Sequence, residues 1–139
     1  MPLVRIDLTE RFSATARRAI ADAVHRSIVE ILKVPDADRF QIISSHRTGD
    51  LIALNAGLNF DRSVDTVIIQ IFTQRGRSTR AKQRLYAEIA GQLAQIGVRG
   101  ENIVIGVTEN GPEDWSFGFG SAQYVTGELA VPNTDEFTD

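Results

Sequence analysis

The sequence predicts a single α+β domain in which two copies of a β-α-β unit form a four-stranded mixed sheet with two helices on one face. Three observations predict this fold. A strand, helix and strand pattern occurs twice along the chain, and the two helical patterns match under a constant shift. In addition, the 139 residues are 42% apolar, which is enough for one hydrophobic core.

The first unit is expected within residues 2–46. Residues 3–8 alternate apolar and polar side chains, as a strand with one buried face does. Ser13 is a suitable N-cap for a helix that continues to Lys33 and ends before Pro35. Residues 40–44 then form the second expected strand. The helix has an apolar stripe at helical spacing, which consists of Ile20, Val24, Ile28 and Ile31.

The second unit is expected within residues 66–110 and repeats this plan. Residues 66–73 are rich in β-branched side chains, Ser78 is the next candidate N-cap, and residues 102–108 form the last strand. The apolar stripe of the second helix consists of Leu85, Ile89, Leu93 and Ile96. A shift of 65 places maps the first cap and all four stripe positions onto the second set. We therefore interpret the chain as an internal duplication within one domain, residues 1–139.

The third strand is apolar on both faces, which indicates that both faces of the sheet are covered. Two helices cover only one face. We expect the other face to pack against neighbouring subunits, which implies an obligate oligomer. The alternative is that residues 51–60 and 115–131 supply the cover. The polar and acidic end, residues 131–139, is expected to be frayed.

Composition excludes several classes of function. The net charge of −3 argues against a nucleic-acid partner. Without cysteine there is no thiol nucleophile and no thiolate metal site. The apolar runs are of strand length, which argues against a membrane partner, and Arg5 and Asp7 interrupt any secretory signal, so a cytoplasmic location is expected. His25 and His46 lack metal-ligand spacing, and His25 is expected at the surface.

Pro2 is the first candidate catalytic residue. Removal of Met1 would leave a secondary amine at the start of the first strand, and the pKa of an α-amino group begins at roughly 7.7–8. Such an amine can act as a general base when neutral or as a proton donor when charged. Many chains begin with Met-Pro, however, and by itself this start is more often without function.

Three further candidates each have a structural alternative. In extended chain, residues two apart point the same way, so Arg75 and Arg77 could face one cleft and bind a carboxylate, or they could belong to a solvated turn. Asp38 could act beside the second strand or cap a turn. Trp115, Phe117 and Phe119 could line an apolar pocket or fill the core.

Together these residues resemble the tautomerase superfamily, and within it the malonate semialdehyde decarboxylase branch. The resemblance covers nearly the whole chain. Its landmarks are Pro2, Val34-Pro35-x-x-Asp38-Arg39-Phe40-Gln41, Arg75-x-Arg77, Glu109-Asn110-x-x-x-Asp114-Trp115-Ser116-Phe117-Gly118 and Tyr124-Val125-Thr126-Gly127-Glu128-Leu129. The resemblance implies a homotrimer that acts on a small carboxylate with no metal and no organic cofactor.

The resemblance also implies roles for the candidates. Pro2 acts as a cationic acid, and Asp38 supports its charge and handles water. Arg77 and Arg75 hold the substrate carboxylate, with Arg77 the arginine that divergent members keep. Trp115 and Phe117 line the pocket. The implied reaction is decarboxylation of malonate semialdehyde, with hydration of acetylenic acids at the same site. Two alternatives stay open: a tautomerase of a 2-oxo acid such as phenylpyruvate with Pro2 as base, and a binding trimer without catalysis.

Overall fold

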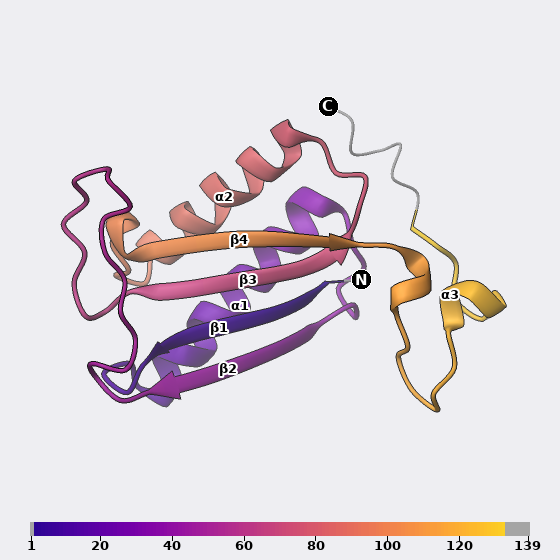
Figure 1. The fold of residues 1–139 in the computed structure, drawn as a ribbon, viewed down its shortest axis with the longest axis horizontal. Helices are drawn as coiled ribbons and strands as arrows, with labels where there is room; N and C mark the ends of the chain where they lie inside the picture. Colours follow the sequence, from indigo (N-terminus) through magenta and orange to yellow (C-terminus); the bar gives the residue numbers. More distant parts are fainter. Residues whose placement is uncertain (1, 133–139) are drawn as a thin grey trace.

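The computed structural model describes residues 2–132, which fold as two β-α-β units followed by a short C-terminal segment (Figure 1). The first unit consists of β1 (Leu3–Thr9), α1 (Ala14–Leu32) and β2 (Phe40–His46). The second consists of β3 (Val67–Gln74), α2 (Thr79–Ala94), a short 3-10 turn η1 (Gly100–Asn102) and β4 (Ile103–Asn110). The C-terminal segment contains η2 (Pro112–Asp114) and α3 (Gln123–Thr126). The predicted fraying of residues 131–139 falls almost entirely outside the described residues.

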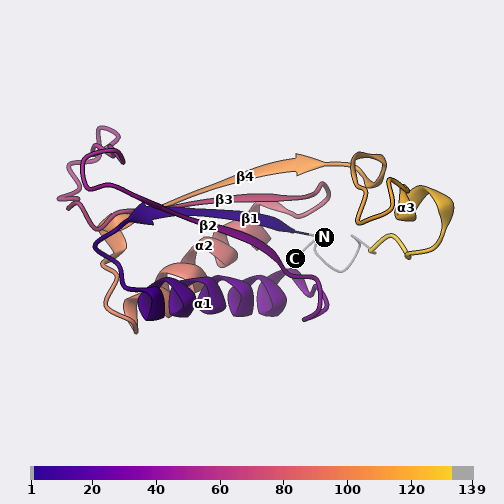
Figure 2. The same ribbon diagram turned by 90° about the horizontal axis from the view of Figure 1, so that it is seen from below.

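The four strands form one mixed sheet in the order β2-β1-β3-β4. Each unit contributes a parallel pair, β1 with β2 and β3 with β4, and the two units join through the antiparallel pair of β1 and β3. Both α1 and α2 lie on the same face of this sheet (Figure 2). The predicted α+β fold with two helices on one face is therefore confirmed.

The two helices begin in the same way because the same residue type caps each. Ser13 Oγ accepts a hydrogen bond from the Ala16 backbone N–H at 3.1 Å, and Ser78 Oγ accepts one from Ala81 at 3.0 Å. This satisfies one of the N–H groups that a helix start leaves without a partner. The end of α2 differs from the prediction, because the helix stops at Ala94 and Ile96 is exposed beyond it. The predicted place of Ile96 in the apolar stripe is thus wrong.

The core lies between the sheet and the two helices. Alternate residues of the central strands point into it, so every second side chain of β1 and β3 is buried. These strand residues pack with the stripes of α1 and α2 in one cluster. The largest fully buried side chains include Ile6, Leu8, Ile69, Ile71, Ile20, Ile28, Leu85, Ile89 and Leu93.

The opposite face of the sheet is not covered by the described residues. Ile42 of β2 lies on it and is 44% exposed. Residues 47–66 extend beyond one end of the sheet and the segment containing α3 extends beyond the other (Figure 1). Ile52 and Leu54 remain exposed there, as does Val125. Self-covering by these two segments, the alternative considered from the sequence, is therefore not what the chain does.

None of the helices within residues 2–132 has the length and apolar character needed to cross a membrane.

Candidate active site

The strand register brings the predicted site residues to one end of the sheet. Leu3, at the start of β1, pairs with Phe40 of β2 and with Phe72 of β3. The chain that leaves β3 leads directly to Arg77, and the chain that leaves β4 leads to Trp115. The N-terminus, the starts of β1 and β2, and the ends of β3 and β4 consequently share this end (Figure 1).

Pro2 is buried and comes immediately before β1. Continuing the two registers one step past Leu3 places Pro2 beside Arg39, just before β2, and beside Thr73 of β3, each one residue away from Asp38 and Gln74 respectively. A free amine at Pro2 would thus lie at this end of the sheet, close to the chain segments that carry Asp38 and Gln74.

Asp38 is half-buried in the turn that precedes β2, where its backbone N–H donates to the Pro35 carbonyl at 3.0 Å. Its carboxylate interacts electrostatically with the hydroxyl of Tyr124. The turn position that the sequence suggested is correct, and the turn presents the carboxylate at the Pro2 end of the sheet.

Arg75 and Arg77 lie in different surroundings. Arg77 is 5% exposed and its Nη1 donates to the Gln74 carbonyl at 2.7 Å. Burial lowers the pKa of the Arg77 guanidinium, and the nearby Glu109 carboxylate and Tyr124 oppose that effect. The Arg75 side chain is 59% exposed and pairs with Glu113 at 3.2 Å. Gly76 between them adopts a φ of 116°, so the backbone bends there, and the extended geometry assumed for the pair is wrong.

Tyr124 joins Asp38 and Arg77 into one cluster, and no role was predicted for it from the sequence. The residue belongs to α3 and is 6% exposed. Burial raises the pKa of its hydroxyl, the Asp38 carboxylate raises it further, and the Arg77 guanidinium acts in the opposite direction. The Tyr124 hydroxyl therefore keeps its proton more firmly than an ordinary phenol, and both a carboxylate and a guanidinium act on it. The sequence feature that could have indicated a role for Tyr124 is the motif of residues 124–129, which begins with it.

Two other buried oxygens at the end of β3 were also missed. Thr73 Oγ1 and Gln74 Oε1 are fully buried and have no hydrogen-bond partner among residues 2–132. Buried polar groups normally have partners, so these atoms are available for a group that binds at this end. Nothing in the sequence distinguished them from ordinary strand residues.

An aromatic stack forms the apolar part of the site. Phe117 stacks on Trp115 at 5.5 Å between ring centroids and on Phe40 at 5.9 Å, and it meets Tyr124 edge-on at 5.3 Å. Trp115 Nε1 donates to Asn110 Oδ1 at 2.8 Å, which fixes the indole at the end of β4. A hollow of about 200 Å³ is lined by Leu3, Phe40, Trp115, Ser116 and Phe117. Trp115 and Phe117 thus line a hollow at the start of β1 instead of filling the core, whereas Phe119 is fully exposed and does neither.

The two histidines lie elsewhere. His25 is buried, which corrects the expected surface position, because its Nε2 bonds to the Asp36 carbonyl at 2.9 Å. His46 is at the opposite end of the sheet and contacts Asp7 Oδ1 at 2.7 Å. Within residues 2–132, no three His, Asp or Glu side chains gather as potential metal ligands.

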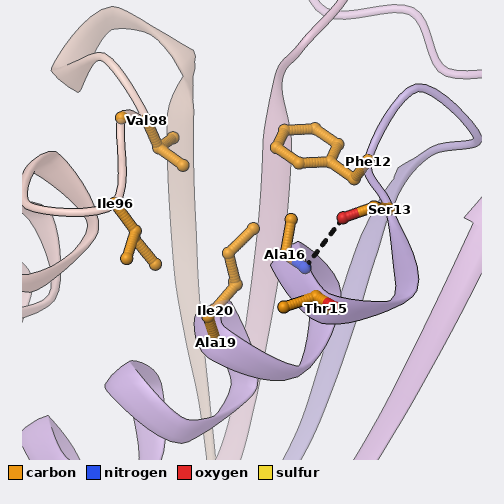
Figure 3. A pocket seen from close by; sticks show the side chains of 9 residues that line it. Phe12, Ser13, Thr15, Ala16, Ala19, Ile20, Ile96 and Val98 are labelled. Carbon is orange, nitrogen blue, oxygen red and sulfur yellow. Dashed lines mark hydrogen bonds between the residues drawn. The ribbon is translucent and has the colours of Figure 1, made fainter.

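A second hollow, of about 280 Å³, lies at the end of the molecule away from Pro2 (Figure 3). Phe12, Ile20, Ile96 and Val98 point toward one another across it, beside the Ser13 cap. It contains none of the predicted site residues.

Comparison with known proteins shows which family the chain belongs to. A family model described as "Tautomerase enzyme" matches residues 38–118, and a second model with the same description matches residues 2–54. The chain belongs to the tautomerase family. Probable tautomerase YrdN of Bacillus subtilis is 35% identical to this family member over 130 residues, covering 93% of this chain and all of that protein.

Solved structures also support membership of the tautomerase family, and two of them are malonate semialdehyde decarboxylases. FG41 malonate semialdehyde decarboxylase inhibited by 3-bromopropiolate is 59% identical, with a TM-score of 0.91 over 94% of this chain and 99% of that one. Another malonate semialdehyde decarboxylase, described with decarboxylase and hydratase activities, is 31% identical, with a TM-score of 0.87 over 92% of this chain and 99% of that one. The present tautomerase-family chain therefore has the fold of these decarboxylases.

Proposed function

We propose that the protein catalyses cofactor-independent decarboxylation of a small β-oxo acid, malonate semialdehyde, to acetaldehyde and carbon dioxide. The observation that carries the proposal is the electrostatic coupling of the buried Tyr124 to both Asp38 and Arg77, at the end of the sheet where Pro2 precedes β1. The 59% identity to a malonate semialdehyde decarboxylase supports the choice of substrate.

In the proposed reaction, Pro2 acts as a secondary ammonium ion. The bond between the carboxylate carbon and C2 of the substrate breaks, and its electron pair forms an enolate whose oxygen had been the aldehyde oxygen. The Pro2 N–H stabilises the charge that develops on that oxygen. This cleavage releases carbon dioxide, and C2 of the enolate then takes a proton from water, which leaves acetaldehyde and hydroxide.

The other residues hold the substrate in the geometry for this bond cleavage. The Arg77 guanidinium attracts the carboxylate, and the Asp38 carboxylate favours the charged form of the Pro2 amine. Phe117 and Trp115 provide an apolar wall, and loss of solvation there favours departure of neutral carbon dioxide. A direct contact between Arg75 and substrate is a weaker part of the proposal, because its side chain is exposed and paired with Glu113.

We further propose that the subunits assemble as a homotrimer. The outer face of the sheet, with Ile42 exposed on it, is an apolar surface that the described residues leave uncovered. A fused 4-OT symmetric trimer is 18% identical with a TM-score of 0.74 over 90% of this chain, a similarity of fold.

The second candidate function is keto–enol tautomerisation of a 2-oxo acid such as phenylpyruvate, with neutral Pro2 as the base. It is favoured by the curated relatives, since the two Bacillus subtilis proteins at 35% and 32% identity are both described as probable tautomerases. A binding trimer without catalysis would follow if Met1 were retained, because an acylated proline nitrogen cannot carry a proton for transfer.

The deciding experiment is a proton NMR assay with malonate semialdehyde and phenylpyruvate side by side, after intact-mass measurement of the N-terminus. We expect loss of Met1, fast formation of acetaldehyde and slow ketonisation. The Pro2→Ala variant should lose decarboxylation, and a nitrogen-15 NMR titration should give a pKa of Pro2 well above neutrality. A fully active Pro2→Ala variant, or a Pro2 pKa below neutrality, would overturn the acid role.

A further inference from the structure

The turn that carries Asp38 is fastened to α1 on both sides of that residue. Asp36, two residues before it, is bound by His25 of α1. Arg39, directly after it, is bound by Asp22 of α1. Asp38 thus stands between two attachments to neighbouring turns of one helix.

The first attachment involves a buried imidazole. His25 is 5% exposed, and its Nε2 lies 2.9 Å from the Asp36 carbonyl and 3.2 Å from Asp36 Oδ1. A carbonyl oxygen only accepts hydrogen bonds, so His25 Nε2 carries the hydrogen and donates it. Because the main chain itself is bound, the attachment limits where the backbone at Asp38 can lie.

The second attachment is a network of charged and polar groups. Arg39 Nη2 donates to Asp22 Oδ1 at 2.6 Å, and Arg39 Nε donates to Gln41 Oε1 at 2.8 Å. Gln41 Nε2 in turn donates to the Ala21 carbonyl at 2.8 Å. The hydrogen bond from Arg39 holds the pKa of the Asp22 carboxyl below its ordinary value, so the pair is charged at neutral pH.

The duplicated half shows that the fold itself does not require these attachments. The 65-residue shift that superimposes the two helices maps Asp22 onto Ala87 and His25 onto Ala90, neither of which can form such bonds. The turn that follows α2 enters β4 at the end of the sheet away from Pro2. Among residues 2–132, the attachments therefore belong to the unit whose turn lies at the candidate site and have no counterpart at the matching positions of the other unit.

We propose that His25 and the Asp22–Arg39 pair are positioning residues that hold the Asp38 carboxylate beside the Pro2 amine. The inference rests on the proposed function in giving Asp38 a part in catalysis. The three side chains act through the turn and contact no substrate themselves.

The experiment uses the full chain and compares His25→Leu, His25→Gln, Asp22→Asn, Arg39→Gln and the Asp22→Asn/Arg39→Gln double variant with Asp38→Asn. Three quantities are measured: kcat and KM for malonate semialdehyde, the pKa of Pro2 by nitrogen-15 NMR, and the melting temperature. His46→Leu is the matched control, because it removes a histidine–aspartate contact of 2.7 Å at the opposite end of the sheet.

We expect kcat in His25→Leu and Arg39→Gln to fall about 10-fold to 100-fold, the range typical of lost supporting contacts around a reacting group, with a smaller change in KM. The pKa of Pro2 should shift in the same direction as in Asp38→Asn. His25→Gln, which keeps a donor near the Nε2 position, should recover most of kcat. The double variant should resemble each single variant of the pair, and His46→Leu should match the wild type.

The inference is overturned if Asp38→Asn changes the pKa of Pro2 while His25→Leu and Arg39→Gln leave it unchanged. It is also overturned if Asp38→Asn leaves that pKa unchanged, because nothing near the amine would then need positioning. If His25→Leu fails to fold, the variants of the half-exposed pair, Asp22→Asn and Arg39→Gln, test the inference through the pKa of Pro2 instead. Should the wild type be inactive on malonate semialdehyde, the proposed function fails, and the Pro2 titration still tests the positioning.

Discussion

Arg75 and Arg77 have opposite environments although only Gly76 separates them. The Arg75 side chain is mostly exposed and pairs with Glu113, whereas Arg77 is buried beside Gln74 and Tyr124. The left-handed backbone at Gly76 turns the second arginine inward. The two guanidiniums are thus expected to contribute unequally to any reaction at this end of the sheet.

Methionine substitutions test this inequality, because methionine replaces the apolar stem of arginine and removes the charged guanidinium. Arg77→Met should lower kcat/KM for malonate semialdehyde about 10-fold to 100-fold, as expected when a charged hydrogen-bond donor is lost. Arg75→Met should change kcat/KM less than about 2-fold, because an exposed ion pair contributes about 0–1 kcal/mol. Steady-state kinetics measure both, with melting temperatures as the folding control. Equal small effects would refute a carboxylate site at Arg77.

The raised pKa of Tyr124 predicts a loss of stability at high pH. Its hydroxyl keeps the proton in the folded chain above pH ~10, where an unfolded tyrosine loses it. The stabilisation that comes from the raised pKa of Tyr124 is therefore fully present below pH ~10. It disappears as the pH rises through the pKa of Tyr124 in the folded chain. Urea unfolding between neutral pH and the alkaline range should show this decline.

Tyr124→Phe should reduce the loss of folding stability at high pH. The chain has two tyrosines, so the variant also leaves Tyr86 as the single phenol in the tyrosinate absorbance titration. The variant should lose a titration step that lies above the ordinary tyrosine pKa. If the variant instead removed a step at the ordinary tyrosine pKa, the burial of the Tyr124 hydroxyl would be contradicted.

The aromatic stack predicts separate effects on stability and on binding. Phe117→Ala removes contacts with Trp115, Phe40 and Tyr124 and should destabilise the fold by about 1–3 kcal/mol, less than for a fully buried ring. It should also raise KM, because the apolar wall of the hollow is lost. Phe117→Leu retains apolar volume and should restore much of both. If Phe117→Ala lowers the stability but leaves the kinetics unchanged, the Phe117 ring contributes to folding and not to substrate binding.

The uncovered sheet face predicts an oligomer that a single charge disrupts. Ile42→Asp places a carboxylate on this face and should dissociate the assembly, which sedimentation velocity would detect. Gln83→Asp adds the same charge on the exposed side of α2 and should leave the assembly intact. A wild-type chain that sediments as a monomer would rule out the proposed homotrimer.

Much of this molecule could be predicted from local sequence patterns. The β-branched strands, the serine caps and the helical stripes act over a few residues, and their repetition at a 65-residue shift predicted the duplicated sheet. The aromatic pair Trp115 and Phe117 and the turn at Asp38 could be selected for the same reason, since each belongs to a short motif.

Only the tertiary structure decided which groups meet. Tyr124, Thr73 and Gln74 join the site through the packing of α3 and the end of β3, contacts between segments distant in sequence. Periodicity does not reveal that His25 reaches Asp36 across the α1–β2 connection, and on that basis it was expected at the surface. Extended geometry was assumed for Arg75 and Arg77, and the φ of Gly76 separates them. Burial and pKa depend on all neighbours in space, and a linear pattern specifies only neighbours along the chain.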